Sequence, residues 1–118
     1  MEKLISLLFL ARDIAHREHL RTDSFAQHMA LGEFYDSIID NADAIAEAYM
    51  GSYGVLKDFP IQASQSSTPI IKELETHVTW IDENRYKVCD KDDAPIQNLI
   101  DAAVETYLSA LYKLKRLK

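Results

Sequence analysis

The chain has 118 residues, of which 47% are hydrophobic and 27% are charged. This balance is typical of one folded globular domain and excludes a disordered or fibrous chain, so we expect a single domain over residues 1–118. A formal net charge of -6 at pH 7 disfavours a surface that binds nucleic acid throughout. The single cysteine, Cys89, excludes an internal disulfide and suits a reducing compartment. We therefore expect a cytoplasmic protein.

The first predicted helix runs from about Glu2 to Leu20. Its opening apolar run is too short to span a bilayer, and amphipathic sequence follows it without a cleavage pattern, so we expect no membrane partner. One face carries the core residues. A second apolar stripe lies about a third of a turn away, and we expect it to contact another subunit, because a helix with one neighbour needs no second stripe. This stripe consists of Ile5, Phe9, His16 and Leu20.

The second predicted helix is the longest. It begins near Asp23 or Ser24, because Ser24 and Gln27 have capping-box spacing, and it ends around Gly51 and Gly54. A mixed strip along this helix includes small residues that let another helix approach closely, which favours a dimer contact. The strip consists of His28, Gly32, Ile39, Ala46 and Met50.

A polar connection, residues 52–67, follows the second helix. Fully extended, it reaches about 50 Å at about 3.3 Å per residue, which is enough to return along the second helix and make the second and third helices parallel. The third helix begins after Pro69 and ends near Cys89, and His77 within it is expected to form an exposed pair with Glu73. Asp92 or Asp93 caps a fourth helix. The sequence predicts an all-α four-helix bundle.

Carboxylates and histidines at helical spacing predict a metal site, because imidazole and carboxylate together can hold iron. The carboxylates are Asp36, Asp40, Asp43 and Glu47, and the histidines are His16 and His28. Asp43 lies about 22 Å beyond His28 on one helix, so a single copy cannot close the site. An antiparallel second copy in a two-fold dimer would close it. The bland alternative is that the acidic stripe is a solvated helix face.

The stretch from His16 to Gly54 resembles the Dps mini-ferritins, which are DNA-protecting iron-storage proteins of the ferritin-like superfamily. In that family a histidine on the first helix is followed twelve residues on by a second histidine. An Asp-x-Ile-Ala-Glu segment then places an aspartate and a glutamate fifteen and nineteen residues further on. The matching positions in this chain are His16, His28, Asp43 and Glu47, the last two within "DAIAE".

The resemblance implies a ferritin-like four-helix bundle with a crossover connection between helices 2 and 3. It also implies a homo-oligomer built from two-fold dimers, with a dodecameric cage as one form. The implied activity is oxidation of Fe(II) to Fe(III) by peroxide or dioxygen at an intersubunit ferroxidase site. His16 and His28 of one subunit and Asp43 and Glu47 of its mate would bind the iron. Asp36 is added as a metal-binding residue, because clustered carboxylates raise the local cation concentration.

Two positions depart from the family pattern. Arg17 stands where the family often has tryptophan, and Gly32 stands where it often has an acidic residue. Glu33, Asp36 or His19 could compensate for these departures, but we expect His19 to be a surface residue outside the site. These departures favour the alternative of a non-enzymatic ferritin-like structural or DNA-associated protein, encoded by a bacterium or by a bacterial virus, that has lost iron chemistry.

The end of the sequence carries its one basic cluster, Lys113, Lys115, Arg116 and Lys118. Repeated many times on an oligomer, this cluster could bind DNA, because multivalency strengthens weak contacts. The alternative is that these cations stabilise the carboxyl end of the fourth helix.

Overall fold

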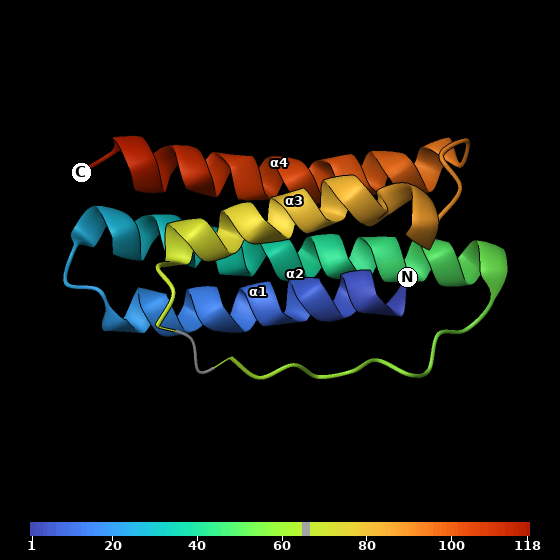
Figure 1. Ribbon diagram of the computed structural model, residues 1–118, viewed down its shortest axis with the longest axis horizontal. Coiled ribbons are helices and arrows are strands. Elements are labelled where there is room, and N and C mark those ends of the chain that lie inside the picture. The colour runs from blue at the N-terminus through green and yellow to red at the C-terminus, as the bar shows by residue number, and fades with distance from the viewer. Residues whose placement is uncertain (65–66) are drawn as a thin grey trace.

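The computed structural model describes residues 1–64 and 67–118. Within them it contains four α-helices and no strand (Figure 1). The helices are α1 (Glu2–Arg21), α2 (Phe25–Tyr53), α3 (Ile70–Val88) and α4 (Ala94–Arg116). They lie side by side in an elongated bundle of 44 × 25 × 21 Å. The predicted all-α class and four-helix bundle are confirmed, and the helix boundaries lie close to those that the sequence predicts.

Local signals set the ends of the helices. The hydroxyl of Ser24 accepts a hydrogen bond from the backbone N–H of Gln27 at 3.3 Å and so caps α2. Gly54 ends the same helix with φ at +101°, a backbone conformation that residues with a Cβ rarely adopt. Asp93 caps α4 by accepting from the N–H of Ile96 at 3.3 Å. Capping chemistry therefore places the turns of the bundle.

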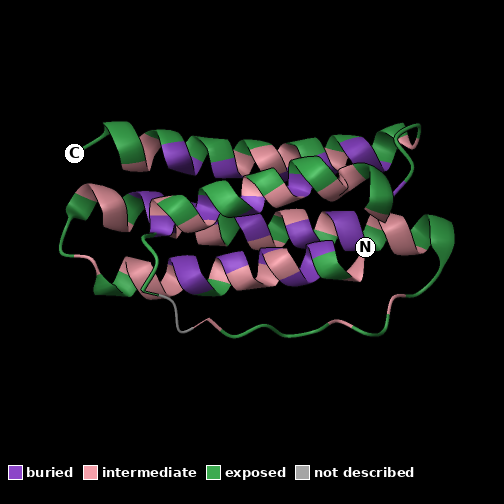
Figure 2. Ribbon diagram, in the orientation of Figure 1, coloured by how far each residue is buried: buried purple, intermediate pink, exposed green. Residues whose placement is uncertain are grey.

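The core lies along the bundle axis, where all four helices bury their apolar faces (Figure 2). Each fully buried Leu or Ile side chain contributes about 1.5–3 kcal/mol. The largest fully buried residues are Leu4, Ile5, Leu8, Leu31, Ile38, Ile45, Leu74, Ile81, Ile96, Ile100 and Tyr107.

The segment that follows α2 extends along α1. The backbone N–H of Asp58 donates to the Glu2 carboxylate at 2.9 Å, near the start of α1, and the Arg17 guanidinium donates to the carbonyl of Ser64 at 2.8 Å, near its end. Figure 1 shows that α2 and α3 point in the same direction as a result. Residues 65 and 66 of the predicted connection lie outside the described residues.

This segment covers part of the second apolar stripe of α1. Ile5 is 1% exposed, and the ring of Phe9 lies 6.3 Å from that of Phe59. The buried hydroxyl of Ser6, next to Ile5, donates to the carbonyl of Pro60. The prediction that the stripe contacts another subunit is wrong at Ile5, which is buried within the chain. Phe9 is half-buried against Phe59, and the prediction stays open there.

Candidate metal centre

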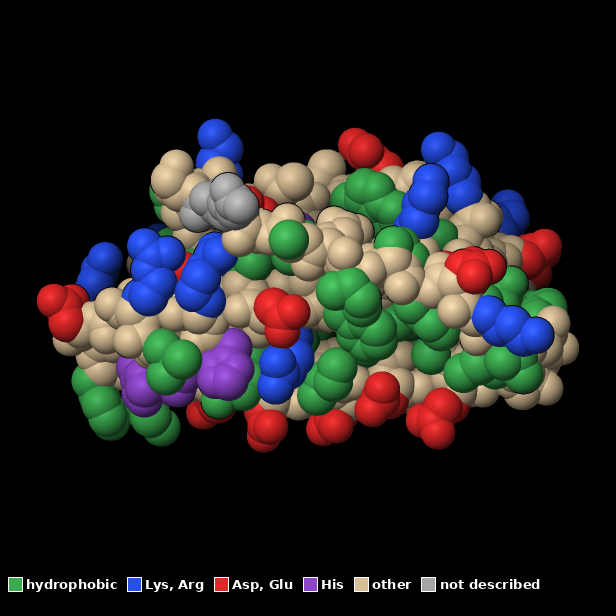
Figure 3. Space-filling view, turned by 90° about the horizontal axis from the view of Figure 1, so that it is seen from below, with side chains coloured by type: hydrophobic (Ala, Val, Ile, Leu, Met, Phe, Trp, Pro, Cys, Tyr) green, Lys and Arg blue, Asp and Glu red, His purple; other side chains and the backbone are tan. Residues whose placement is uncertain are grey.

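The joint between α1 and α2 gathers aromatic rings from both helices. It consists of three residues, Thr22 to Ser24, so the end of α1 lies beside the start of α2. His19 and His28 stack across it, with ring centroids 3.7 Å apart and planes at 19°. His16 stacks on Tyr35 at 4.3 Å. On the face in Figure 3, histidines gather near one end and acidic side chains follow an edge.

The two stacked histidines bind each other's backbone. Nδ1 of His19 lies 2.6 Å from the carbonyl oxygen of His28, and Nδ1 of His28 lies 2.8 Å from the carbonyl oxygen of His19. A carbonyl can only accept, so both Nδ1 atoms carry the proton. In the neutral rings both Nε2 atoms are then left with a lone pair. This is the tautomer that histidine commonly adopts when Nε2 binds a metal.

The predicted carboxylates lie elsewhere on α2. Asp36, Asp43 and Glu47 are exposed, and they form no hydrogen bond or ion pair within the described part of the chain. Because α2 is one continuous helix of 29 residues, Asp43 lies about 22 Å from His28. A single chain therefore keeps the predicted imidazole and carboxylate ligands apart.

Within a single chain the described histidine rings do not form a closed metal site. The centroids of His16 and His19 are 6.1 Å apart. Among residues 1–64 and 67–118, no group of three or more His, Cys, Asp or Glu side chains could hold a metal ion. The described residues of one chain therefore offer no complete set of side-chain ligands for a metal ion at this joint.

His19 is the cluster member that the sequence reasoning left outside the site. It is half-buried, it stacks on His28, and its ring lies 5.3 Å from Tyr35 in an edge contact. A signal for it was present in the sequence as Gly32. A Cβ at position 32 would lie 3.2 Å from Cε1 of His19 and 3.3 Å from Nδ1. The glycine therefore gives the His19 ring its space.

The other departure, Arg17, has a structural role. Its Nε atom donates to Glu18 at 3.1 Å, in addition to the bond with the Ser64 carbonyl. Arg17 thereby holds the α2–α3 connection against the end of α1.

The fourth histidine is in the core. His77 is 3% exposed, which corrects the prediction of an exposed pair, because the ring packs inward against Tyr107. Its Nδ1 lies 3.0 Å from the Tyr107 hydroxyl, and its Nε2 lies 3.8 Å from the Glu73 carboxylate. Burial lowers the pKa of His77 to about 4, although Glu73 opposes the shift. Burial also raises the pKa of Tyr107.

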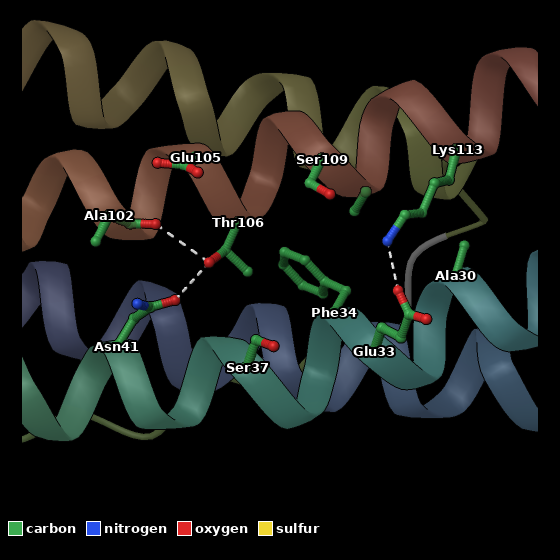
Figure 4. A pocket seen from close by; sticks show the side chains of 11 residues that line it. Ala30, Glu33, Phe34, Ser37, Asn41, Ala102, Glu105, Thr106, Ser109 and Lys113 are labelled. Atoms are coloured by element: carbon green, nitrogen blue, oxygen red, sulfur yellow. Dashed lines mark hydrogen bonds and ion pairs between the residues drawn. The ribbon is translucent and has the colours of Figure 1, made fainter.

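A groove of about 350 Å³ runs between α2 and α4 (Figure 4). Its walls carry small and polar side chains, and the Thr106 hydroxyl donates across it to the Asn41 amide oxygen at 2.7 Å. Lys113 and Glu33 form an ion pair in its lining. None of the predicted metal ligands lines this groove.

The basic cluster at the end of α4 is partly neutralised. Lys113 pairs with Glu33, and the Nζ atom of Lys115 lies 2.7 Å from the Glu75 carboxylate. Half of the predicted DNA-binding cations thus have acidic partners on the same chain.

The fold and the site together define an all-α bundle with a histidine cluster at the joint of its first two helices. None of its described helices combines the length and the apolar character needed to cross a membrane. The chain belongs to a family of unknown function, DUF5856, whose model matches residues 19–114. This range contains His19, His28, Asp43 and Glu47 and leaves His16 outside. No curated protein and no solved structure matches the chain.

Proposed function

We propose that this chain is a Dps-like subunit of the ferritin-like superfamily that oxidises Fe(II) and sequesters iron in a homo-oligomer. The observation that carries the proposal is the short distance from Nδ1 of His28 to a backbone carbonyl oxygen at the α1–α2 joint, which implies that Nδ1 carries the proton. His28 donates its Nδ1 proton to a backbone carbonyl, which leaves Nε2 as a metal-binding atom on a ring held in place by stacking. His16 would contribute a second imidazole.

The carboxylates would come from a second copy. An antiparallel two-fold axis beside residues 35 and 36 places His28 opposite Asp43 of the partner subunit, because both are equally far from the axis along α2. Glu47 of the partner subunit would follow one turn later, and Asp36 would lie next to the axis. Apolar side chains at the joint support association, since Leu20 is 71% and Phe25 78% exposed.

The direction of the helices supports the superfamily assignment. A connection that returns along the bundle and makes α2 and α3 parallel is what a ferritin-like crossover requires. Short connections alone would give an up-down-up-down bundle, in which these two helices are antiparallel.

The proposed reaction uses iron as its substrate. Two Fe(II) ions each give one electron to one molecule of peroxide, which takes up two protons and becomes two water molecules. With dioxygen as oxidant, two Fe(II) ions each give one electron to one dioxygen molecule, which takes up two protons and becomes hydrogen peroxide. The protein would contribute neutral imidazoles and ionised carboxylates that bind both iron states, with a coordination position left for the oxidant.

A second candidate function has its own support. The reciprocal bonds of His19 and His28 join α1 to α2 without any metal, and Arg17 packs the connection where the resembled family often has tryptophan. A non-enzymatic ferritin-like structural or DNA-associated protein would need no more. In that case the histidines are a structural clasp.

Iron oxidation beside a charge-matched control separates the two candidates. We expect the purified chain to form a large oligomer by light scattering and to oxidise Fe(II) with peroxide or air. The double variant Asp43→Ala/Glu47→Ala should keep its mass and fall to the background rate. The control Asp82→Ala/Glu83→Ala removes two exposed carboxylates from α3 and should oxidise iron normally. Equal background rates in all three proteins would favour the structural role.

A further inference from the structure

The groove between α2 and α4 is bounded at both ends by a polar pair. Lys113 forms an ion pair with Glu33 at one end, and the Thr106 hydroxyl donates to Asn41 at the other. Figure 4 shows Phe34 between the two pairs, with small side chains of both helices on the walls. A volume of about 350 Å³ is far more than one water molecule needs, and it lies at the lower end of the range for ligand pockets. The groove can therefore hold a small, elongated molecule.

Two hydroxyl groups in the lining are left without a partner. Ser37 on α2 and Ser109 on α4 line the groove, and neither forms a hydrogen bond within the part of the chain that the structure describes. A hydroxyl in the interior of a helix often bonds to the carbonyl of the preceding turn, as the Thr76 and Thr79 hydroxyls do on α3. Both serine oxygens are thus free to accept a hydrogen bond from a ligand.

The charges of the lining are unequal. Glu33 and Glu105 are its acidic residues, and the ammonium group of Lys113, its one basic residue, is already paired with Glu33. Glu105 precedes Lys113 by two turns of α4, about 12 Å along the helix, and it forms no ion pair with any described residue. An unpaired carboxylate near acceptor hydroxyls favours a cationic ligand that donates hydrogen bonds.

Lys113 shows which kind of cation fits the groove. Its side chain is an aliphatic stem that ends in an ammonium group, and that group lies on the carboxylate of Glu33. We infer that the groove is a binding site for a linear aliphatic polyamine. One ammonium group of the ligand binds Glu105, and the methylene chain lies over Phe34. A second ammonium group takes the place of Lys113 at Glu33.

Displacement of Lys113 from Glu33 costs little. The Glu33 side chain is 60% exposed, and ion pairs in contact with solvent contribute little to stability. The polyamine site is also separate from the proposed metal centre, because none of the predicted metal ligands lines the groove. Polyamine binding can therefore succeed or fail independently of iron oxidation.

Calorimetric titration with spermidine, a linear triamine, tests this inference on two matched pairs of variants. In the first pair, Glu105→Gln should weaken binding by about tenfold, because it removes the unpaired carboxylate. Glu83→Gln removes the same charge from an exposed position on α3 outside the groove and should bind nearly as the wild type does. Equal affinity in these two variants would mean that spermidine responds only to net charge, which would overturn the inference.

The second pair should change the affinity in the opposite direction. Lys113→Gln frees Glu33 for the ligand, so this variant should bind spermidine several-fold more tightly than the wild type. Lys115→Gln removes the same charge from a lysine that pairs with Glu75 outside the groove, and its affinity should stay close to that of the wild type. Circular dichroism of all four variants should show wild-type helix content. Equal affinity in the two lysine variants, or no binding of spermidine to the wild type, would contradict the inference.

Discussion

Histidine serves in two contrasting settings in this bundle. At the α1–α2 joint, His19 and His28 are half-buried and bind backbone carbonyls through Nδ1, so each Nε2 is left for another partner. In the core, His77 is 3% exposed and lies between the Tyr107 hydroxyl and Glu73. The joint therefore has donor atoms to offer, and the core uses its imidazole internally. The burial of the whole residue, more than the residue type, separates a candidate ligand from a packing residue.

The largest difference in the free energy of unfolding should come from removing one tyrosine at a time, Tyr107 from the core and Tyr35 from the joint. Tyr107 is fully buried against Phe34 and His77, so Tyr107→Ala should lower the free energy of unfolding by about 3–5 kcal/mol. Tyr35 is half-buried beside His16, so Tyr35→Ala should lower the free energy of unfolding by only about 1 kcal/mol. Urea denaturation followed by circular dichroism measures both. Similar losses would mean that the joint is as tightly packed as the core.

The next largest effect should be a loss of stability at acid pH that is caused by the core histidine, His77. The pKa of His77 is lowered to about 4, first by burial, so the unfolded chain takes up a proton near pH 6.5 while the folded chain resists it. Stability is therefore lost as pH falls from about 6.5 to about 4, by about 3 kcal/mol in total. The variant His77→Gln can still bond to Tyr107 and does not titrate. Urea denaturation across this range should show a shallower pH dependence in the variant, and equal slopes would contradict the assignment.

The helices were predictable because their signals are local. Apolar spacing gave the four helices, and Ser24, Gly54 and Asp93 are capping residues that act on neighbours a few positions away. The burial of His77 was not predictable, since it depends on Tyr107 thirty positions away. The apolar spacing of a helix is the same whether a histidine on it lies at the edge of the core or on the surface, so the spacing could not decide the burial of His77.

The candidate site was predictable only in part. A metal bound by both His28 and Asp43 would need a second copy of the chain, as their spacing on one helix indicates, and α2 is continuous between them. The role of His19 was not visible, because Gly32 first looked like a lost acidic ligand. The structure gives the glycine a different meaning, as space for a ring from the neighbouring helix. Contacts across the joint carry this information, and the periodicity of one helix does not.

A smaller effect on the free energy of unfolding is expected from removal of the N-cap of α2 at the joint. Ser24→Ala removes the acceptor for the Gln27 N–H and should lower the free energy of unfolding by about 1 kcal/mol. Ser37→Ala, at an exposed position inside α2, should change it by less than about 0.5 kcal/mol. Urea denaturation of both variants tests whether the joint is held by local bonds. Equal effects would mean that the Ser24 cap adds nothing.

The smallest contrast concerns the basic end of α4 and the DNA-associated alternative. Lys113 and Lys115 already pair with Glu33 and Glu75, and each exposed pair is worth at most about 1 kcal/mol. Under that alternative, Arg116→Gln/Lys118→Gln should weaken DNA retardation several-fold more than Lys113→Gln/Lys115→Gln, although both remove the same charge. The paired lysines must leave their carboxylates before they can bind phosphate, so part of their binding energy is lost. Equal weakening would show that the ion pairs do not restrain the lysines, and no retardation of the wild type at low salt would exclude a DNA-associated role.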